Sequence, residues 1–87
     1  MKRKAIGQSP KARGPNTQNP RLLFGSRVRK LRIERDLSQE KLAELAHLHR
    51  NYVGGVERGE RNIGLLNLVK LAHALDVRPM SLLETIA

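Results

Sequence analysis

Apolar side chains recur with a helical spacing from residue 21 onwards. Phe24, Val28 and Leu31 stand at positions i, i+4 and i+7, with basic residues on the other faces. This period matches the turn of an α-helix and predicts a helix over 21–35. No stretch of the chain alternates apolar and polar residues over the length of a strand. The pattern therefore favours an all-α fold.

Further helices are predicted at 39–46, 50–58, 65–75 and from Pro79 onwards. Ser38 is a suitable N-cap for the first of these, because its hydroxyl can accept a free amide hydrogen of the first turn. Gly59 is a strong stop signal for the second. Pro79 suits the first position of the last helix. We therefore expect five short helices and no sheet.

The first 20 residues have a different composition. They hold several Lys and Arg, no acid, and repeated Pro and Gly. Such a segment buries too little apolar surface to offset the entropy lost on ordering. We expect a disordered basic arm over 1–20 and a folded domain over 21–87. The arm is either a DNA contact of the minor-groove kind or a solvated tail, and the sequence leaves both open.

The chain is strongly basic, since 17 Lys and Arg against 8 Asp and Glu give a formal net charge of +9. A polyanion is the leading partner, because cations that neutralise phosphates release condensed counterions. A basic domain without a specific partner is the alternative. Aromatic residues make up only 2% of the chain, which argues against modules that stack single-stranded bases.

Other function classes lack their usual signals. There is no Cys, the three His stand at no ligand-like spacing, and no Ser lies in a nucleophile motif. We therefore expect no enzyme activity, no metal and no cofactor. No apolar run is long enough to cross a bilayer, and the N-terminus does not look like a secretory signal. We expect a cytoplasmic protein, associated with the nucleoid when it is bound to DNA.

The strongest motif lies in residues 37–62, whose sequence is LSQEKLAELAHLHRNYVGGVERGERN. It resembles the Cro and phage-repressor type of helix-turn-helix, the XRE family. Matching positions of the motif are occupied by Gln39, Ala43, Val53 and Val56. The part HRNYVGGVERGERN also resembles controller proteins of restriction–modification systems. His47 stands where the family usually has Gly, so we expect a left-handed His at this turn, at some strain.

The resemblance covers residues 21–87 and implies sequence-specific binding of double-stranded DNA by a transcriptional regulator of the repressor or controller type. It also implies a homodimer on a palindromic operator, with half-sites about 34–36 Å apart. Leu82, Leu83 and Ile86 would form the apolar dimer face. Two alternatives remain open. One is an antitoxin-like protein that binds a toxin partner and its own promoter, and the other is a non-specific nucleic-acid-binding module.

Spacing divides the predicted helix 50–58 into two faces. Val53, Val56 and Glu57 face inward, and the opposite face is formed by Arg50, Asn51, Gly54, Gly55 and Arg58. This outer face is free to enter a major groove, where Arg50 can bond guanine and Asn51 can bond adenine. We group Tyr52 with these base readers; contact with a phosphate or sugar, or a half-buried ring, are its other interpretations.

Gly54 and Gly55 are unfavourable inside a helix, at about 1 kcal/mol each relative to Ala. We favour the interpretation that their missing side chains allow close approach to the groove. Relief of crowding against another part of the protein is the alternative.

The remaining contacts are predicted to go to the DNA backbone, from Gln39, His49, Arg58, Arg61 and Asn62. By resemblance, Gln39 binds a phosphate at the start of its helix and braces Arg50. His49 takes the N-cap place of helix 50–58, so a weak cap is its other interpretation. Arg32 and Glu57 match family positions that form an ion pair across the core, and we expect that pair here.

Overall fold

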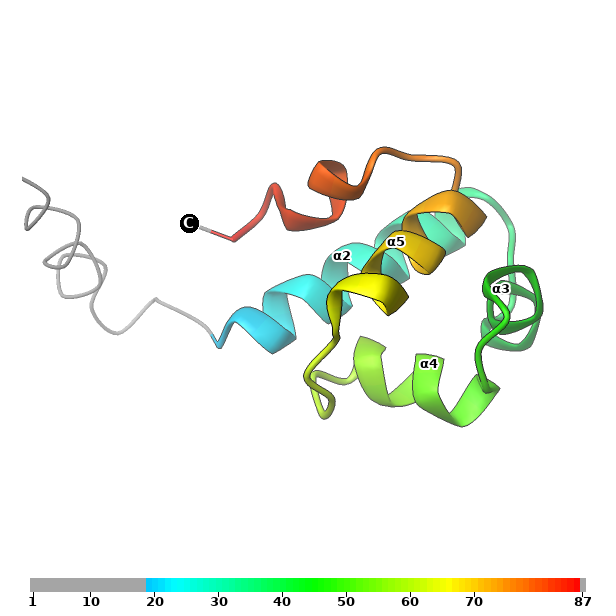
Figure 1. Cartoon of the computed structure of the whole chain (residues 1–87), viewed down its shortest axis with the longest axis horizontal. Helices are drawn as coiled ribbons and strands as arrows, with labels where there is room; N and C mark the ends of the chain where they lie inside the picture. The colour runs from blue at the N-terminus through cyan, green and yellow to red at the C-terminus, as the bar shows by residue number, and fades with distance from the viewer. Residues whose placement is uncertain (1–18, 87) are drawn as a thin grey trace, which may run out of the picture.

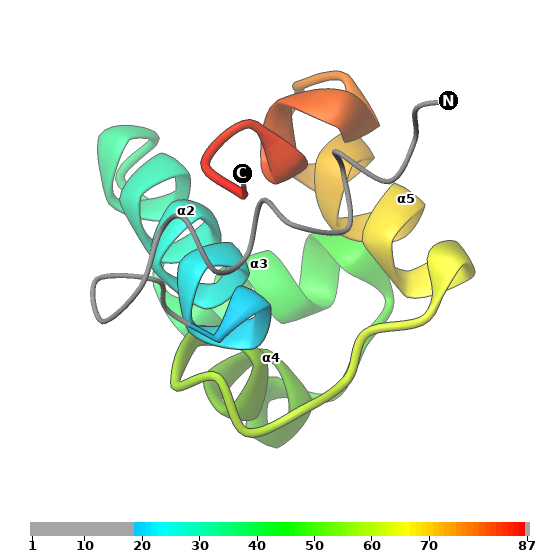
Figure 2. The same cartoon turned by 90° about the vertical axis from the view of Figure 1, so that its left-hand side faces the viewer.

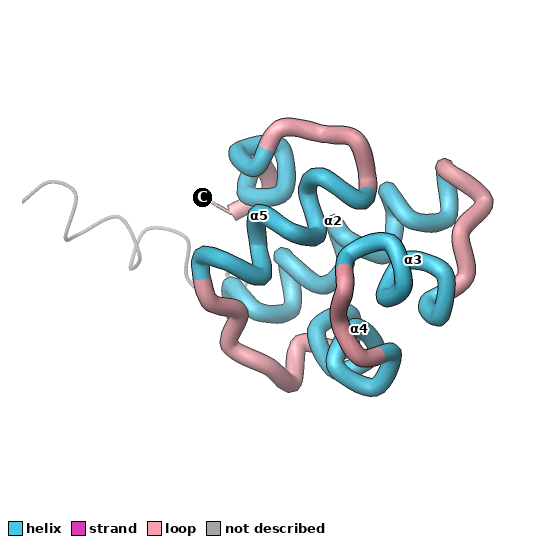
Figure 3. Tube along the Cα trace, turned by 45° about the vertical axis from the view of Figure 1, so that its right-hand side comes forward, coloured by secondary structure: helices cyan, strands magenta, loops and turns pink. Residues whose placement is uncertain are grey.

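A computed structural model describes residues 19–86, and every regular element in that range is helical (Figure 3). In chain order the elements are α2 (Pro20–Glu34), α3 (Gln39–Ala46), α4 (Arg50–Glu57), α5 (Leu65–Ala74) and the 3₁₀-helix η2 (Pro79–Leu83). The all-α prediction is confirmed for this part of the chain. The predicted count of five helices is not confirmed, because this part of the chain forms four α-helices and its last element is a short 3₁₀-helix, the tighter form that is common in pieces of this length.

The first helix begins one residue earlier than the apolar pattern predicts. The side chain of Asn19 caps it, with Oδ1 accepting the Arg21 N–H at 2.8 Å. Pro20 follows at the first helical position, where its missing N–H removes no helical hydrogen bond. The predicted arm over 1–20 therefore overlaps the start of α2. The rest of that arm lies outside the described residues.

The helices pack so that α4 and η2 lie on opposite sides of the molecule (Figures 1 and 2). α4 packs against α2 and α3, while η2 packs against α2 and α5. The core between them receives apolar side chains from all five elements, among them the fully buried Val28, Leu42, Val53, Leu71 and Leu82. Each such side chain stabilises the fold by about 1.5–3 kcal/mol. α4 is thus held from two directions while one of its faces stays at the surface.

The predicted dimer face needs a correction at Leu82. This side chain is fully buried in the core, whereas Leu83 is 44% exposed and Ile86 is half-buried. Leu82 therefore has no surface to offer a partner. In a 3₁₀-helix neighbouring side chains point about 120° apart, so Leu82 can face inward while Leu83 faces outward.

α2 and α4 approach each other closely at Gly25. A Cβ at this position would overlap the carbonyl oxygen of Val56 and would lie 2.6 Å from that of Glu57. A side chain here would push α4 away from α2, so this contact requires glycine. The apolar pattern of residues 21–35 gave no reason to single out Gly25, although an unfavourable Gly inside a helix is itself a signal of close approach.

The turn between α3 and α4 is as tight as the motif requires. His47 has φ 59° and ψ 43°, which confirms the left-handed conformation expected at this position. Its N–H bonds the carbonyl of Glu44, and the N–H of Leu48 bonds that of Ala43 at 2.8 Å. These bonds satisfy carbonyl groups at the end of α3. α4 ends at Glu57, and Gly59 follows with φ 78°.

Candidate nucleic-acid interface

α4 has one buried and one exposed face. Val53, Val56 and Glu57 are buried, and Arg50 and Asn51 at its start are exposed. The division by spacing is thus reproduced for these residues.

A network of charged and polar side chains holds the buried face in place. Arg32 donates from Nε and NH2 to the two carboxylate oxygens of Glu57, at 2.6 and 3.1 Å. Its NH1 also donates to the carbonyl of Leu37 at 2.8 Å, and Gln39 Nε2 donates to Glu57 Oε1 at 2.9 Å. The Arg32 and Glu57 side chains are only 12% and 2% exposed. The network therefore ties α2, its following loop and α3 to the end of α4.

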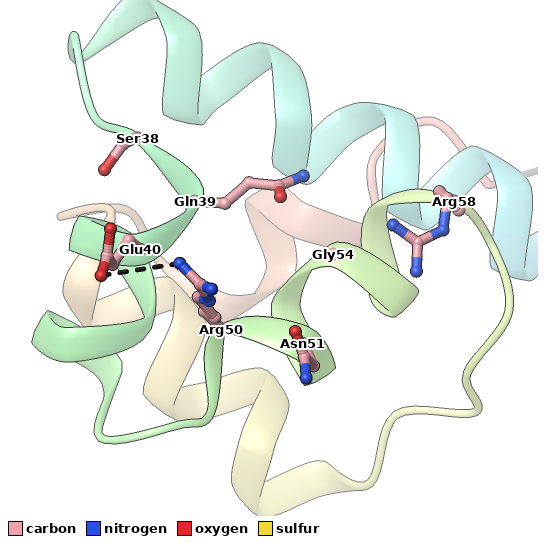
Figure 4. A pocket seen from close by; sticks show the side chains of 7 residues that line it. All are labelled: Ser38, Gln39, Glu40, Arg50, Asn51, Gly54 and Arg58. Atoms are coloured by element: carbon pink, nitrogen blue, oxygen red, sulfur yellow. Dashed lines mark ion pairs between the residues drawn. The ribbon is translucent and has the colours of Figure 1, made fainter.

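A polar groove of about 420 Å³ lies between the start of α3 and the exposed face of α4 (Figure 4). Its lining comes from Ser38, Gln39, Glu40, Arg50, Asn51, Gly54 and Arg58. Arg50 reaches across it toward Glu40, with 3.7 Å between NH1 and Oε2. Both side chains are largely exposed, and such pairs contribute only about 0–1 kcal/mol. Arg50 can therefore exchange Glu40 for another acceptor at little cost.

The start of α4 is capped by a histidine. His49 Nδ1 accepts the N–H of Asn51 at 3.1 Å. Because an accepting ring nitrogen carries no hydrogen, the neutral ring in this arrangement has its proton on Nε2. His49 is exposed, so Nε2 can donate to an external acceptor beside the start of α4. The cap and the backbone-contact predictions for His49 are compatible.

Beyond the end of α4, Arg58 pairs with Glu60. Arg58 Nε donates to Glu60 Oε2 at 3.0 Å, and both side chains are more than half exposed. This hydrogen bond raises the pKa of Arg58 and lowers the pKa of Glu60. Both groups are therefore charged at neutral pH, and Arg58 has an internal partner that a phosphate would have to replace.

Tyr52 lies at the junction of α4, α5 and the loop between them. Its ring is half-buried, and its hydroxyl oxygen accepts a hydrogen bond from Asn67 Nδ2 at 3.2 Å. The guanidinium carbon of Arg61 lies 5.6 Å from the ring centroid, within the range of a cation–π contact.

The sequence profile of the Helix-turn-helix family matches residues 28–82. The match runs from the middle of α2 to the end of the core in η2 and covers more than half of the chain. The chain belongs to the helix-turn-helix family of DNA-binding transcriptional regulators.

Several relatives of this helix-turn-helix protein are control proteins. It is 49% identical over 69 residues to control protein C.BamHI of Bacillus amyloliquefaciens, a match that covers 78% of this chain and 85% of the relative. It is 48% identical over 61 residues to control protein C.SmaI of Serratia marcescens, covering 70% and 73%. These matches confirm the resemblance found in residues 37–62.

A solved structure leads to the same family. The restriction-modification controller protein C.AhdI from Aeromonas hydrophila superposes with a TM-score of 0.71 at 56% identity, covering 71% of this chain and 94% of that one. α3 and α4 are accordingly the two helices of the helix-turn-helix unit. The family consists of transcription regulators rather than enzymes.

Only some of the predicted site residues line the polar groove between α3 and α4. Arg50, Asn51, Gln39 and Arg58 line it, while Tyr52 and Arg61 lie on the neighbouring side of α4. Arg61 and Asn62 both line an apolar groove of about 250 Å³, together with Phe24, Ile63, Leu68, Leu83 and Ile86.

Gly54 and Gly55 have little exposed surface, although the spacing places them on the outer face and Gly54 lines the polar groove. Both are buried. A Cβ at Gly54 would lie 3.1 Å from Arg58 NH1, and one at Gly55 would lie 3.0 Å from Arg61 Cγ. Close approach to a DNA groove at these glycines therefore requires the two arginine side chains to move.

Two polar partners of the site could not be predicted from the sequence. Glu40 pairs with Arg50, and Asn67 bonds Tyr52. Ten residues separate Glu40 from Arg50 and fifteen separate Asn67 from Tyr52, so no spacing rule within one helix relates them. Only opposite charge on successive helices pointed to the first pair.

No helix within residues 19–86 combines the length and the apolar character needed to cross a membrane. In the same part of the chain, no three His, Asp or Glu side chains gather closely enough to hold a metal ion.

Proposed function

We propose that this protein recognises a specific operator in duplex DNA by placing the exposed face of α4 in the major groove, and that it thereby controls genes of a restriction–modification system. The observation that carries this proposal is the exposed pair Arg50 and Asn51 at the start of a helix whose other face is fixed by a buried ion pair. Side chains that read bases need such a support, because small errors in position remove bidentate bonds. The similar solved structure of the restriction-modification controller protein C.AhdI suggests the class of regulated gene.

The contacts divide into two groups under this proposal. Arg50 would donate two bonds to guanine O6 and N7, and Asn51 would bond adenine N6 and N7, each pair contributing about 1–3 kcal/mol of discrimination. The backbone contacts would come from Gln39, His49, Arg58, Arg61 and Asn62, which fix the register without reading sequence. Gln39 already donates one amide hydrogen to Glu57, which leaves its second one for a phosphate beside the start of α3.

A homodimer completes the proposed reader. Leu83 and Ile86 line an apolar groove together with the half-buried Ile63, and these three residues would form the dimer face in place of the buried Leu82. Because these residues lie outside α4, a two-fold dimer leaves both copies of α4 exposed. We infer a palindromic operator with half-sites about 34–36 Å apart, a cytoplasmic location on the nucleoid, and regulation by occupancy without catalysis or cofactor.

Selection from a pool of random duplexes tests this function. The expected result is a palindromic consensus bound by two protein chains. The selected duplex should bind at least about 1,000-fold more tightly than a shuffled one at physiological salt. Equal affinity for the two duplexes would reject specific recognition and favour a general nucleic-acid-binding module. Co-purification of a neighbouring gene product that blocks DNA binding would favour the antitoxin-like alternative.

A further inference from the structure

The side chain of Arg61 runs across α4 at Gly55. A Cβ at Gly55 would lie 3.0 Å from Cγ, 3.2 Å from Nε and 3.6 Å from Cδ of Arg61. The first two distances are shorter than ordinary van der Waals contact, so a side chain at position 55 would require the stem of Arg61 to shift by a few tenths of an ångström. Its guanidinium then reaches Tyr52, which lies one helical turn earlier on α4.

Tyr52 is itself fixed from a third element. Asn67 on α5 donates to its hydroxyl oxygen, and its ring packs against the core. A ring held in this way offers a stationary face to the guanidinium of Arg61. Three residues thus determine where this loop arginine lies: Gly55 makes the space, Tyr52 supplies the ring and Asn67 fixes the ring.

We propose that Gly55 is a positioning residue. Because it has no side chain, Arg61 can lie across α4 and against the ring of Tyr52 before the protein binds DNA. The proposal rests on the proposed function, in which Arg61 contacts the DNA backbone. An arginine that is already oriented loses less side-chain freedom on binding, and it therefore binds a phosphate more tightly than one that is free to rotate. The cost of a glycine inside α4 is then explained by the protein's own loop rather than by the DNA groove.

The neighbouring Gly54 provides a contrast within the same turn. A Cβ there would meet NH1 at the tip of Arg58, at 3.1 Å, and Gln39 Oε1 at 3.4 Å. The tip of a long side chain can swing aside at little cost, whereas the nearest atom at Gly55 is Cγ in the stem of Arg61, and a shift there changes the position of the guanidinium relative to the ring of Tyr52. Replacement of either glycine by alanine raises helix propensity equally, so Gly54→Ala is a matched control for Gly55→Ala in the unbound protein.

NMR of the full chain without DNA directly tests whether Arg61 lies against Tyr52. Protons of Arg61 that lie over the face of Tyr52 should resonate upfield of their usual shifts. Phe24 lines a groove together with Arg61 and also has a ring current, so the Tyr52→Leu variant assigns the shift to Tyr52. The upfield shift should disappear in Gly55→Ala and in Tyr52→Leu and should persist in Gly54→Ala. Helical amide signals of α4 should remain in all variants. Equal Arg61 shifts in the wild type, Gly55→Ala and Tyr52→Leu would overturn the proposal.

A double-mutant cycle on the selected operator tests the consequence for binding. Gly55→Ala should weaken binding about tenfold in the wild-type background, as expected for one misplaced charge-assisted bond. In an Arg61→Ala background it should cause no further loss, because its effect acts through Arg61. An equal loss of affinity in both backgrounds would indicate that Gly55 allows close approach to the DNA groove, and it would overturn the proposal that Gly55 positions Arg61. If the wild-type chain binds no duplex, only the proposed function is overturned. The NMR shifts test the position of Arg61 independently, because they are measured without DNA.

Discussion

The two faces of α4 use the same kinds of ion pair in opposite ways. On the inner face, Arg32 and Glu57 are nearly inaccessible and are joined by two hydrogen bonds. On the outer face, Arg50 lies 3.7 Å from the exposed carboxylate of Glu40. A buried charge that loses its partner keeps its desolvation penalty, whereas an exposed one is rehydrated. Burial therefore makes the first pair a structural connection and leaves the second exchangeable.

This difference suits a helix that must keep a fixed orientation and still have side chains available to bind DNA. The inner network fixes the direction of α4 relative to α2 and α3, which the close contact at Gly25 reinforces. The outer arginines meet weak internal acceptors that DNA phosphates and bases can replace. The protein thereby offers its DNA-contacting groups on a helix whose orientation does not have to be established during binding.

Breaking the inner pair should have the largest effect of the changes considered. Arg32→Ala strands the carboxylate of Glu57, so the free energy of unfolding should fall by about 3–5 kcal/mol. Urea denaturation followed by circular dichroism measures this loss. The double variant Arg32→Met with Glu57→Leu removes both charges and should recover most of the stability. A loss below about 1 kcal/mol for Arg32→Ala would show that the pair behaves like an exposed one.

Most of the fold was predictable because its signals are local. Apolar spacing located α3 without error and α2, α4 and α5 to within a residue at each end, and Ser38 caps α3 as expected. His47 adopts the left-handed turn conformation despite its side chain. Each of these features depends on the preferences of a few consecutive residues, which a sequence displays directly.

The errors concern features that depend on tertiary contacts. Whether the residues after Pro79 form an α- or a 3₁₀-helix is decided by their packing on α2 and α5, and that choice turns Leu82 into the core. The cover over Gly55 comes from a loop arginine whose course no periodicity encodes. Glu40 and Arg50 become neighbours only when the turn folds α4 back beside α3. The candidate site was thus predicted as a set of residues, but not as a set of partners.

On the outer face, loss of the proposed base reader should have the next largest effect. Arg50→Ala should weaken operator binding by about 1–3 kcal/mol and relax the base preference at one position, because a bidentate bond is lost. The fold should be unaffected, since this side chain is exposed. Titration of operator and single-base variants measures both effects.

Arg61→Ala provides the contrasting outcome among the proposed DNA contacts. It should weaken all duplexes alike and reduce the slope of log affinity against log salt by about one. If Arg50→Ala kept the base preference of the wild type, Arg50 would not be a base-contacting residue, and the proposed orientation of α4 would be contradicted.

Substitution of Glu40, the partner of Arg50, should have a smaller effect, and it should change specificity more than affinity. Glu40→Gln frees Arg50 and removes a negative charge beside the DNA, so binding to random duplexes should strengthen by about two- to fivefold, within the range of one exposed pair. Operator binding should strengthen less, and the ratio between the two should fall. Glu44→Gln is the matched control, because Glu44 lies on the same helix but pairs with Lys41. Equal ratios in the two variants would mean that Glu40 does not orient Arg50.

The smallest effect is expected from the pair beyond the end of α4. Glu60→Gln removes the acceptor that holds Arg58, so binding to every duplex should strengthen about twofold without a change in base preference, and the gain should vanish at high salt. Glu84→Gln changes the net charge equally, but Glu84 directly follows η2 and pairs with Arg27 of α2 rather than with Arg58. Titrations of random duplex at two salt concentrations compare the variants. If both gained equally, overall charge would explain the effect, and Arg58 would not exchange Glu60 for phosphate.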